Sequence, residues 1–399
     1  MVVIFFLSLA LSFFFPVKII FFYLYFAGAI WGISYLWTRS NRERLSISRQ
    51  LACQELFFGE EFEAELVIEN RSPFPLPWLY IYDLIPVRLY QRSTFRDLIH
   101  LPGKSSARLP YRLVASRRGY YSLGPWEARS TDLFGIYPWR LTQAAPQYVT
   151  VYPKIVPLRE LSIASRQPFG TVRTNIRVFE DPSRRAGLRE YRIGDSYNKI
   201  NWKVTARTGK LHVNLYLPSI SLGTMIFLNL ASLDYQRPYD DDLERAIVVA
   251  ASVASHITGL RQEVGLTCNG GIDSPKAGKR SEGISISLNK GDSHLRQILM
   301  VLARLEAVDE PGFIEFLTGR WLESQSFRLP WGTALIFISS GPSDLLFLRL
   351  LELCRTGYNI TLFLVQISSD QLHQLRGRWQ SKGIKIYRVR EEEDLQALE

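Results

Sequence analysis

The spacing of apolar residues changes near residue 222, and this change constrains the fold more than any other feature of the sequence. Between residues 45 and 221 the apolar stretches are short, whereas beyond residue 222 continuous apolar runs alternate with segments in which apolar residues recur every three or four positions. Continuous runs of this length are typical of buried strands, and the longer spacing is typical of amphipathic helices. We therefore expect residues 222–399 to form an α/β domain with a mostly parallel sheet covered by helices.

The same pattern predicts the individual elements of this domain. Asp240 to Asp242 suit the amino terminus of the first helix, because carboxylates cap free amides and interact favourably with the helix dipole. From Leu243 to Leu260, apolar side chains then recur on one face of that helix. The predicted strands are 224–230, 264–268, 334–339, 360–365 and 384–389, and the later predicted helices are 294–308, 344–355 and 370–382.

Short strands and turns are expected over residues 45–155. Between Glu61 and Glu69 apolar and polar residues alternate, which is the period of a half-buried strand. Clusters of Pro, Gly, Asn and Ser separate such stretches and indicate turns. We expect an immunoglobulin-like β-sandwich here, an all-β domain in which two sheets enclose a core.

The amino-terminal residues 1–37 carry one charged side chain, Lys18, and are divided at Pro16 into two apolar runs. A helix of roughly 20 residues spans a bilayer, so this pattern predicts a transmembrane helical hairpin, with a single longer span as the alternative. Four arginines follow the second run: Arg39, Arg42, Arg44 and Arg49. The positive-inside rule then predicts a multi-pass protein of the inner (plasma) membrane, anchored in the lipid bilayer with its other domains in the cytoplasm.

Composition and rare residues exclude several classes of protein. Apolar residues make up 47% of the chain and charged residues 22%, which excludes a disordered or collagen-like protein. The three cysteines are odd in number and dispersed, so no disulfide framework is expected, and the five histidines show no metal-binding spacing. No nucleophile elbow or phosphate-binding loop occurs. We therefore expect no cofactor and no catalysed reaction.

The most distinctive stretch lies in an arginine-rich connecting module, residues 156–221. Its candidate site residues are Arg189, Tyr191, Gly194, Asp195, Asn201, Trp202, Lys203 and Arg207. Gly194 suits a turn with a positive backbone angle, after which Asp195 can pair with an arginine or cap local amides. Two interpretations fit this mixture of charges and aromatic rings. One is an ion-paired clasp between the sandwich and the α/β domain, and the other is a protein docking surface rich in hot-spot residue types.

Two further interpretations of this module stay open. A hydrolase that uses Tyr191, Asp195 and Lys203 requires a strongly shifted pKa and a pocket, neither of which the sequence shows. The basic character of the module and the net charge of +10 also suit an anionic lipid surface or a nucleic acid. Nucleic acid is the less favoured ligand, because no recognition helix or RNP-like strand is found.

Three sequence motifs resemble the signature of the family called "domain of unknown function 58": 188–195 (LREYRIGD), 200–203 (INWK) and 205–207 (TAR). The resemblance extends to 117–125, 131–135 and 151–153, so it covers essentially the whole chain. It implies a membrane hairpin, a β-sandwich, the signature module and a carboxy-terminal domain similar to von Willebrand factor A domains. It also implies two kinds of partner, MoxR-type AAA+ ATPases and transglutaminase-like membrane proteins, while the family's own activity is not established.

Von Willebrand A domains that bind a divalent metal do so where the first strand ends in Asp-x-Ser-x-Ser, a set of hard oxygen ligands. The corresponding residues here are Asn229, Ala231 and Leu233, which supply neither the anionic charge nor the two hydroxyls. We therefore expect that no metal binds at these positions although the fold is kept. The resulting hypothesis is a non-enzymatic, membrane-anchored adaptor or scaffold that works with a MoxR-type AAA+ ATPase through protein–protein contacts.

Overall fold

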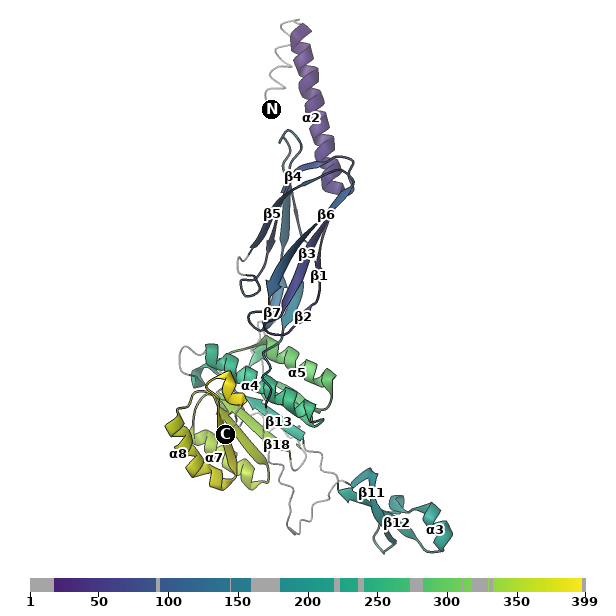
Figure 1. Ribbon diagram of the computed structural model, residues 1–399, viewed down its shortest axis with the longest axis vertical. Helices are drawn as coiled ribbons and strands as arrows, with labels where there is room; N and C mark the ends of the chain where they lie inside the picture. The colour runs from purple at the N-terminus through teal and green to yellow at the C-terminus, as the bar shows by residue number, and fades with distance from the viewer. Residues whose placement is uncertain are drawn as a thin grey trace. The chain divides into compact units, whose positions relative to one another are not determined.

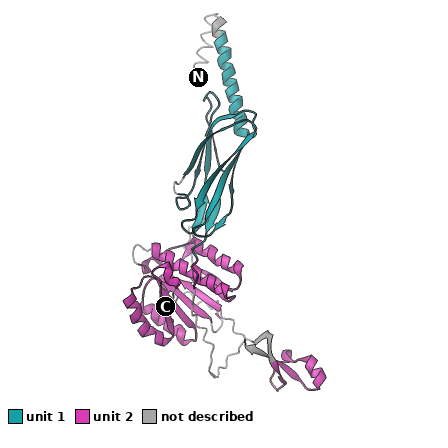
Figure 2. Ribbon diagram, in the orientation of Figure 1, with its two compact units in different colours: residues 1–154 teal, residues 155–399 magenta. Residues whose placement is uncertain are grey.

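The computed structural model of the protein is an α+β structure that divides into two compact units, residues 1–154 and 155–399 (Figures 1 and 2). Separate apolar cores lie in the two units. The structure describes residues 18–90, 94–143, 145–158, 180–218, 223–235, 240–272, 283–309, 312–317, 329 and 333–396.

The first described element is a single helix, α2 (Lys18–Arg44). Its carboxy-terminal half contacts the loop before β4. The Trp37 indole donates to the Pro75 carbonyl at 3.0 Å, and its ring stacks on Phe74 with centroids 5.0 Å apart. The Asn41 amide donates to the same carbonyl at 3.2 Å. This half of α2 is therefore an integral part of the first unit.

The transmembrane hairpin expected over residues 1–37 is not supported. Its first run falls on residues 1–17, which lie outside the described residues. Among the residues that the structure describes, no helix is both long enough and apolar enough to cross a membrane. The charged residues of α2 are Lys18 at its start and Arg39, Arg42, Glu43 and Arg44 in its last two turns. This finding overturns the hairpin in the predicted fold class, together with the multi-pass inner-membrane localisation that was inferred from it.

The strands of the first unit form three sheets around one core, an arrangement consistent with the predicted β-sandwich. The sheets have the orders β1-β3-β6, β2-β10-β7 and β5-β4-β8-β9. The strands are β1 (Leu45–Leu51), β2 (Glu55–Leu56), β3 (Glu61–Asn70), β4 (Leu76–Leu84), β5 (Thr94–Leu101), β6 (Ser105–Val114), β7 (Gly119–Leu123), β8 (Trp126–Ser130), β9 (Trp139–Thr142) and β10 (Gln147–Val151). The predicted alternating strand is confirmed as β3, whose buried apolar residues are Phe62, Ala64, Leu66 and Ile68.

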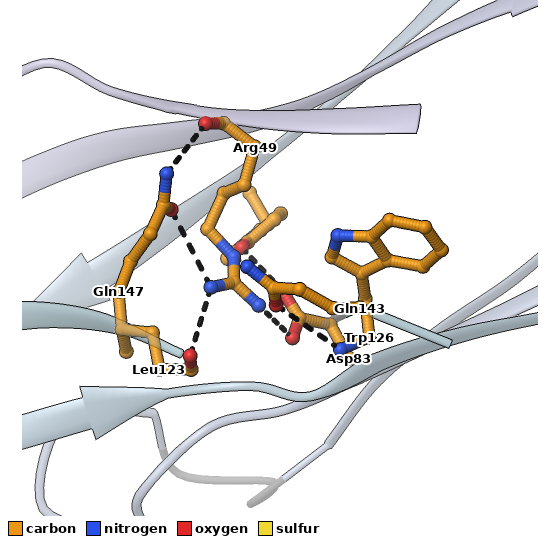
Figure 3. Close-up of polar contacts among 7 residues, drawn as sticks. Arg49, Asp83, Leu123, Trp126, Gln143 and Gln147 are labelled. Atoms are coloured by element: carbon orange, nitrogen blue, oxygen red, sulfur yellow. Dashed lines mark hydrogen bonds and ion pairs between the residues drawn. The ribbon is translucent and has the colours of Figure 1, made fainter. Parts of the chain in front are cut away.

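A buried polar cluster crosses the core of the first unit (Figure 3). The Arg49 guanidinium forms a bidentate ion pair with Asp83, and both side chains are 0% exposed. Arg49 Nε lies 2.9 Å from Asp83 Oδ2, and the Tyr111 hydroxyl donates to the same oxygen at 2.7 Å. Arg49 also donates to the Leu123 carbonyl at 3.0 Å. The cluster joins β1, β4, β6 and the end of β7, so it ties the three sheets together.

The position of Arg49 corrects the role that its sequence neighbourhood predicts. Arg49 follows Arg39, Arg42 and Arg44 closely, so the positive-inside argument counts it as a fourth flanking charge. In the structure it is instead part of β1, where the strand turns its side chain into the core. Burial, together with the Asp83 carboxylate, also raises the pKa of Tyr111 well above its ordinary value. The cluster is therefore a structural element of the sandwich.

The second unit contains a six-stranded sheet in the order β16-β14-β13-β18-β19-β20. Neighbouring strands are parallel except for β14 and β16. The strands are β13 (Gly223–Leu228), β14 (Glu263–Cys268), β16 (Ile284–Asn289), β18 (Ala334–Ser339), β19 (Asn359–Leu364) and β20 (Ile384–Arg388). The main helices of this part are α4 (Asp240–Gly259), α5 (Asp292–Arg304), α7 (Asp344–Arg355) and α8 (Ser369–Trp379). Every residue of β13 and β18 is buried, as expected for central strands of a covered sheet.

The chain order of these strands creates a switch point between β13 and β18. From β13 the chain passes to β14 on one side of β13, and it later returns as β18 on the other side. Open α/β sheets bind ligands at the carboxyl ends of the strands at such a point. The short elements around it are η2 (Ser232–Asp234), β15 (Gly271–Ile272), β17 (Leu305–Glu306) and α6 (Phe313–Glu315), and η4 (Gln380–Lys382) and η5 (Glu392–Leu395) follow α8 and β20.

Most predicted elements of this sheet domain are confirmed to within two residues, and β18 and α7 have the predicted bounds. The helix predicted over 294–308 is shorter, because α5 ends at Arg304 and β17 follows it to pair with β15. Leu260, expected on the buried face of α4, is 54% exposed because the helix ends at Gly259. The antiparallel edge strand β16 was not predicted.

Candidate functional site

The signature residues lie on a β-hairpin that we call the hairpin module, residues 187–215. Strands β11 (Glu180–Glu190) and β12 (His212–Pro218) pair antiparallel. The connection between them contains a 3₁₀ turn, η1 (Tyr197–Lys199), and one short helix, α3 (Trp202–Thr208). Figure 1 labels β11, β12 and α3. All eight predicted site residues are therefore brought onto one hairpin and its connection.

Arg189 and Asp195 close the first turn of the hairpin module. Two guanidinium nitrogens of Arg189 donate to the two carboxylate oxygens of Asp195 at 2.7 and 2.6 Å. The Arg192 amide donates to Asp195 at 2.8 Å, and Gly194 has the predicted positive backbone angle, with φ +104°. A Cβ at residue 194 would meet nothing within 4 Å, so glycine serves the backbone conformation rather than close packing. The ion pair is thus a contact within one turn.

Asn201 positions helix α3 on strand β12. Its side-chain oxygen accepts a hydrogen bond from the Val204 amide at 3.1 Å, which makes it the N-cap of the helix. Its side-chain nitrogen donates to Asn214 Oδ1 at 2.9 Å, and its backbone N–H donates to the His212 carbonyl at 2.8 Å. One asparagine therefore satisfies a free helix amide and attaches the helix to the neighbouring strand.

Of the exposed large apolar side chains in the hairpin module, three are the most exposed. Ile193 is 102% exposed, Tyr197 is 73% exposed and Trp202 is 66% exposed. The Tyr197 ring stacks on Tyr191, with centroids 6.0 Å apart and an interplanar angle of 20°. Single exposed apolar side chains are common on protein surfaces. Several large ones on one short segment are typical of an interaction surface.

The sequence reasoning identified only part of this exposed set. It singled out Trp202, and also the half-buried Tyr191 that stacks on Tyr197, but it missed Ile193 and Tyr197. The sequence does contain a feature that indicates the exposure of Ile193. This β-branched residue comes directly before the turn glycine Gly194, and a side chain at such a position has nothing to pack against. Four of the eight predicted residues shape the module: Arg189, Gly194, Asp195 and Asn201. Trp202, Lys203 and Arg207 face outward instead.

The hairpin module carries a positive charge. Its basic residues are Arg189, Arg192, Lys199, Lys203, Arg207 and Lys210, and its acidic residues are Glu190 and Asp195. Both acidic side chains form ion pairs, Asp195 with Arg189 and Glu190 with Lys210 at 3.1 Å. Arg192, Lys203 and Arg207 are exposed. The outward surface therefore combines aromatic groups with cations.

The environment of Tyr191 and Asp195 bears on the hydrolase interpretation. Hydrogen bonds from Arg189 and from the Arg192 amide lower the pKa of Asp195 below its ordinary value. A hydrogen bond with Tyr197 raises the pKa of Tyr191. A general base works best with a pKa near the working pH and a free approach to the substrate. Both side chains are therefore better suited to holding the turn than to transferring protons.

The residues at the expected metal position lie at the carboxyl end of β13. The Asn229 amide nitrogen donates to the Asp234 carboxylate at 2.9 Å and to the Ser339 hydroxyl, at the end of β18, at 3.1 Å. Asn229 Oδ1 accepts from the Ala231 amide at 3.0 Å, and Leu233 is 71% exposed. The Asn229 amide thus sits between two oxygens that could otherwise contact a cation. Within the described part of the chain, no group of three or more His, Cys, Asp or Glu could hold a metal ion.

These features describe an α+β protein with a basic, aromatic hairpin, and that hairpin lies in a stretch that matches a known family model. The family model described as "Protein of unknown function DUF58" matches residues 187–311, which include the whole hairpin module. The chain is also similar to the uncharacterized protein YeaD of Bacillus subtilis (strain 168), with 23% identity over 270 residues. That match covers 66% of this chain and 63% of YeaD, so the chain spans less than two thirds of that relative.

Similar solved structures share only a low overall likeness. A CARDB domain from Pyrococcus furiosus is 17% identical, with a TM-score of 0.21, and the match covers 27% of this chain and 91% of that one. A chain of a complex between zinc 2-glycoprotein and prolactin inducible protein from human seminal plasma is 11% identical, with a TM-score of 0.22. That match covers 26% of this chain and 92% of the other. Neither likeness carries an inference about this protein.

Proposed function

We propose that this protein is a non-enzymatic adaptor that binds a partner protein through the outward side chains of the hairpin module. The observation that carries the proposal is the exposure of Ile193, Tyr197 and Trp202 on a backbone that ion pairs and a helix cap hold in place. Tryptophan and tyrosine dominate binding hot spots, and a preorganised backbone reduces the entropy lost on association. The module therefore has the properties of a docking surface.

The charges of the module define the surface that its partner presents. Glu190 and Asp195 are already paired, so the exposed cations Arg192, Lys203 and Arg207 give the outward face a positive potential. A partner with acidic residues around an apolar pocket complements this face. Exposed charges act mainly on the association rate and are screened by salt, so binding should weaken as the ionic strength rises.

We further propose that the partner is a MoxR-type AAA+ ATPase and that the sheet domain, residues 222–399, is related to von Willebrand factor A domains. The family resemblance supports the choice of ATPase, because it implies this partner. The parallel sheet with a switch point supports the second part. The match to the DUF58 model begins at residue 187, so the module belongs to the part of the chain that this family shares.

A binding measurement between the purified full chain and the recombinant ATPase, with ATP, with ADP and without nucleotide, tests the proposal. Trp202→Ala should weaken binding by roughly 30-fold, the equivalent of a hot-spot loss of about 2 kcal/mol. Trp78→Ala is the matched control, because Trp78 is a 43% exposed tryptophan in the first unit. Unchanged binding in Trp202→Ala and Ile193→Ala would refute the docking surface. Salt-sensitive binding of nucleic acid without any binding of the ATPase would favour that ligand instead.

A further inference from the structure

A pocket of about 360 Å³ lies at the switch point, where β13 and β18 end. Asp234 follows β13, Ser339 and Ser340 close β18, and Gln366 follows β19. Phe313, Ile314, Pro342 and Leu346 also line it. This volume is at the small end of the range for ligand sites, about 300–1,000 Å³, so the pocket suits a group the size of one amino-acid side chain.

Asp234 gives this pocket its charge. It is the one charged residue among the described residues that line the pocket. The Asn229 amide and the Phe313 N–H both donate to Asp234 Oδ2, at 2.9 and 3.3 Å, and no described residue donates to Oδ1. The Ser340 hydroxyl donates to the Asp234 backbone carbonyl and so fixes the turn that presents the side chain. One carboxylate oxygen therefore remains as an anionic acceptor in the pocket.

Further carboxylates surround the same end of the sheet. Asp242 accepts a hydrogen bond from the pocket residue Gln366 and pairs with Arg245 at 2.6 Å. Asp309 accepts from the Ser232 hydroxyl at 2.6 Å, and Asp344, in the first turn of α7, lies 3.8 Å from Arg378. Because Asp242 and Asp344 have arginine partners, they add little net charge at this end of the sheet. The carboxylate that favours a cation over an anion in the pocket is therefore Asp234.

The pocket also has apolar walls beside Asp234. Pro342 lies just before α7, Leu346 lies in the first turn of that helix, and Ile314 comes from α6. Lysine and arginine side chains place their methylene stems along apolar surface while the charged end finds a polar partner. Apolar side chains do not ligate a small metal ion. The Asn229 amide also occupies the space between Asp234 and Ser339.

We propose that this pocket binds an organic cation, an ammonium or guanidinium group, through Asp234. The methylene stem of the ligand lies along Pro342 and Leu346. The cation belongs either to a lysine or arginine side chain of another polypeptide or to a free small amine. This site is separate from the hairpin module, so its existence does not depend on the proposed adaptor function.

Calorimetric titration of the full chain with paired small probes tests this site. Nα-acetyl-arginine amide carries the cation, and Nα-acetyl-citrulline amide has nearly the same shape without the charge. We expect the arginine probe to bind at least tenfold more tightly, because a hydrogen bond to a charged group is lost with citrulline. Free L-arginine and L-lysine distinguish the sources: weaker binding than the capped probe indicates a polypeptide side chain, and tighter binding indicates a free amine.

The variant Asp234→Asn should reduce the affinity for the arginine probe at least tenfold and leave the citrulline probe unchanged. Asp241→Asn is the matched control, since Asp241 is an exposed carboxylate of α4 outside the pocket lining. Equal binding of the arginine and citrulline probes to the unaltered chain would overturn the proposal, even if Asp234→Asn failed to fold. Tight Mg²⁺ or Mn²⁺ binding that competes with the arginine probe would also overturn it.

Discussion

The substitution Asp83→Asn is expected to destabilise the first unit by about 3–5 kcal/mol, because it leaves the Arg49 guanidinium buried without a counter-charge. The two side chains are 0% exposed, so water cannot replace the lost carboxylate. Arg49 keeps only neutral partners, the Leu123 carbonyl at 3.0 Å and the Gln147 amide oxygen at 3.5 Å. The new amide oxygen can still accept from Tyr111, so the loss arises mainly from the unpaired charge.

Hydrogen exchange of the full chain, read by mass spectrometry, measures this loss in the first unit separately from the second. At about 1.4 kcal/mol per tenfold change, exchange through global opening of β1, β4 and β6 should accelerate by more than a hundredfold. Peptides of the second unit serve as the internal control. Adding Arg49→Met to Asp83→Asn removes the buried, unpaired charge of Arg49 and should recover part of the lost stability. A loss below about 1 kcal/mol, or a double variant less stable than the single one, would refute the reasoning.

Three further substitutions test other parts of the structure. Asn201→Ala should cost about 1 kcal/mol of local stability by removing the cap of α3 and should speed tryptic cleavage within it, whereas Asn201→Asp keeps the cap, loses only the hydrogen bond to Asn214 and should speed cleavage less. Asn229→Asp places a second carboxylate beside Asp234 and Ser339 and should create Mn²⁺ binding, visible by calorimetry, that the unaltered chain lacks. Burial alone would raise the pKa of Glu127, but hydrogen bonds from Tyr82 and Arg129 outweigh that effect and lower it. The thermal stability of the first unit should therefore fall as the pH drops below the ordinary carboxyl pKa of 4.5, and Glu127→Gln should weaken this dependence.

Local patterns predicted much of the fold. The strand β3 follows from the alternation of Phe62, Ala64, Leu66 and Ile68 with polar residues or Val67, and β18 and α7 follow from an apolar run succeeded by helical spacing. Each of these elements buries one face or both, so the pattern of apolar residues within the element itself was enough to predict it. The edge strand β16 was missed, because its pairing with β14 depends on residues distant in the sequence. The predicted transmembrane hairpin was wrong because, among the described residues, no helix is both long enough and apolar enough to cross a membrane.

The candidate site was predictable where its contacts are local. Asp195 pairs with Arg189 six residues away, and Gly194 takes the backbone angle that glycine favours, so both roles could be inferred from spacing. The contacts of Asn229 could not be inferred, because Ser339 reaches it only through the neighbouring strand β18. Sequence comparison treated Asn229 as a lost ligand, whereas the structure shows it as a hydrogen-bond donor that holds Asp234 at the pocket.

Site-specific photo-cross-linking tests the docking surface most directly. A photoreactive phenylalanine analogue replaces Trp202 in one variant and Trp78 in a control variant, and each full-length chain is irradiated with the ATPase and nucleotide. The adaptor account predicts a cross-linked product from position 202 and none from position 78. Equal cross-linking from both positions, or none from position 202 in a complex that forms normally, would contradict it.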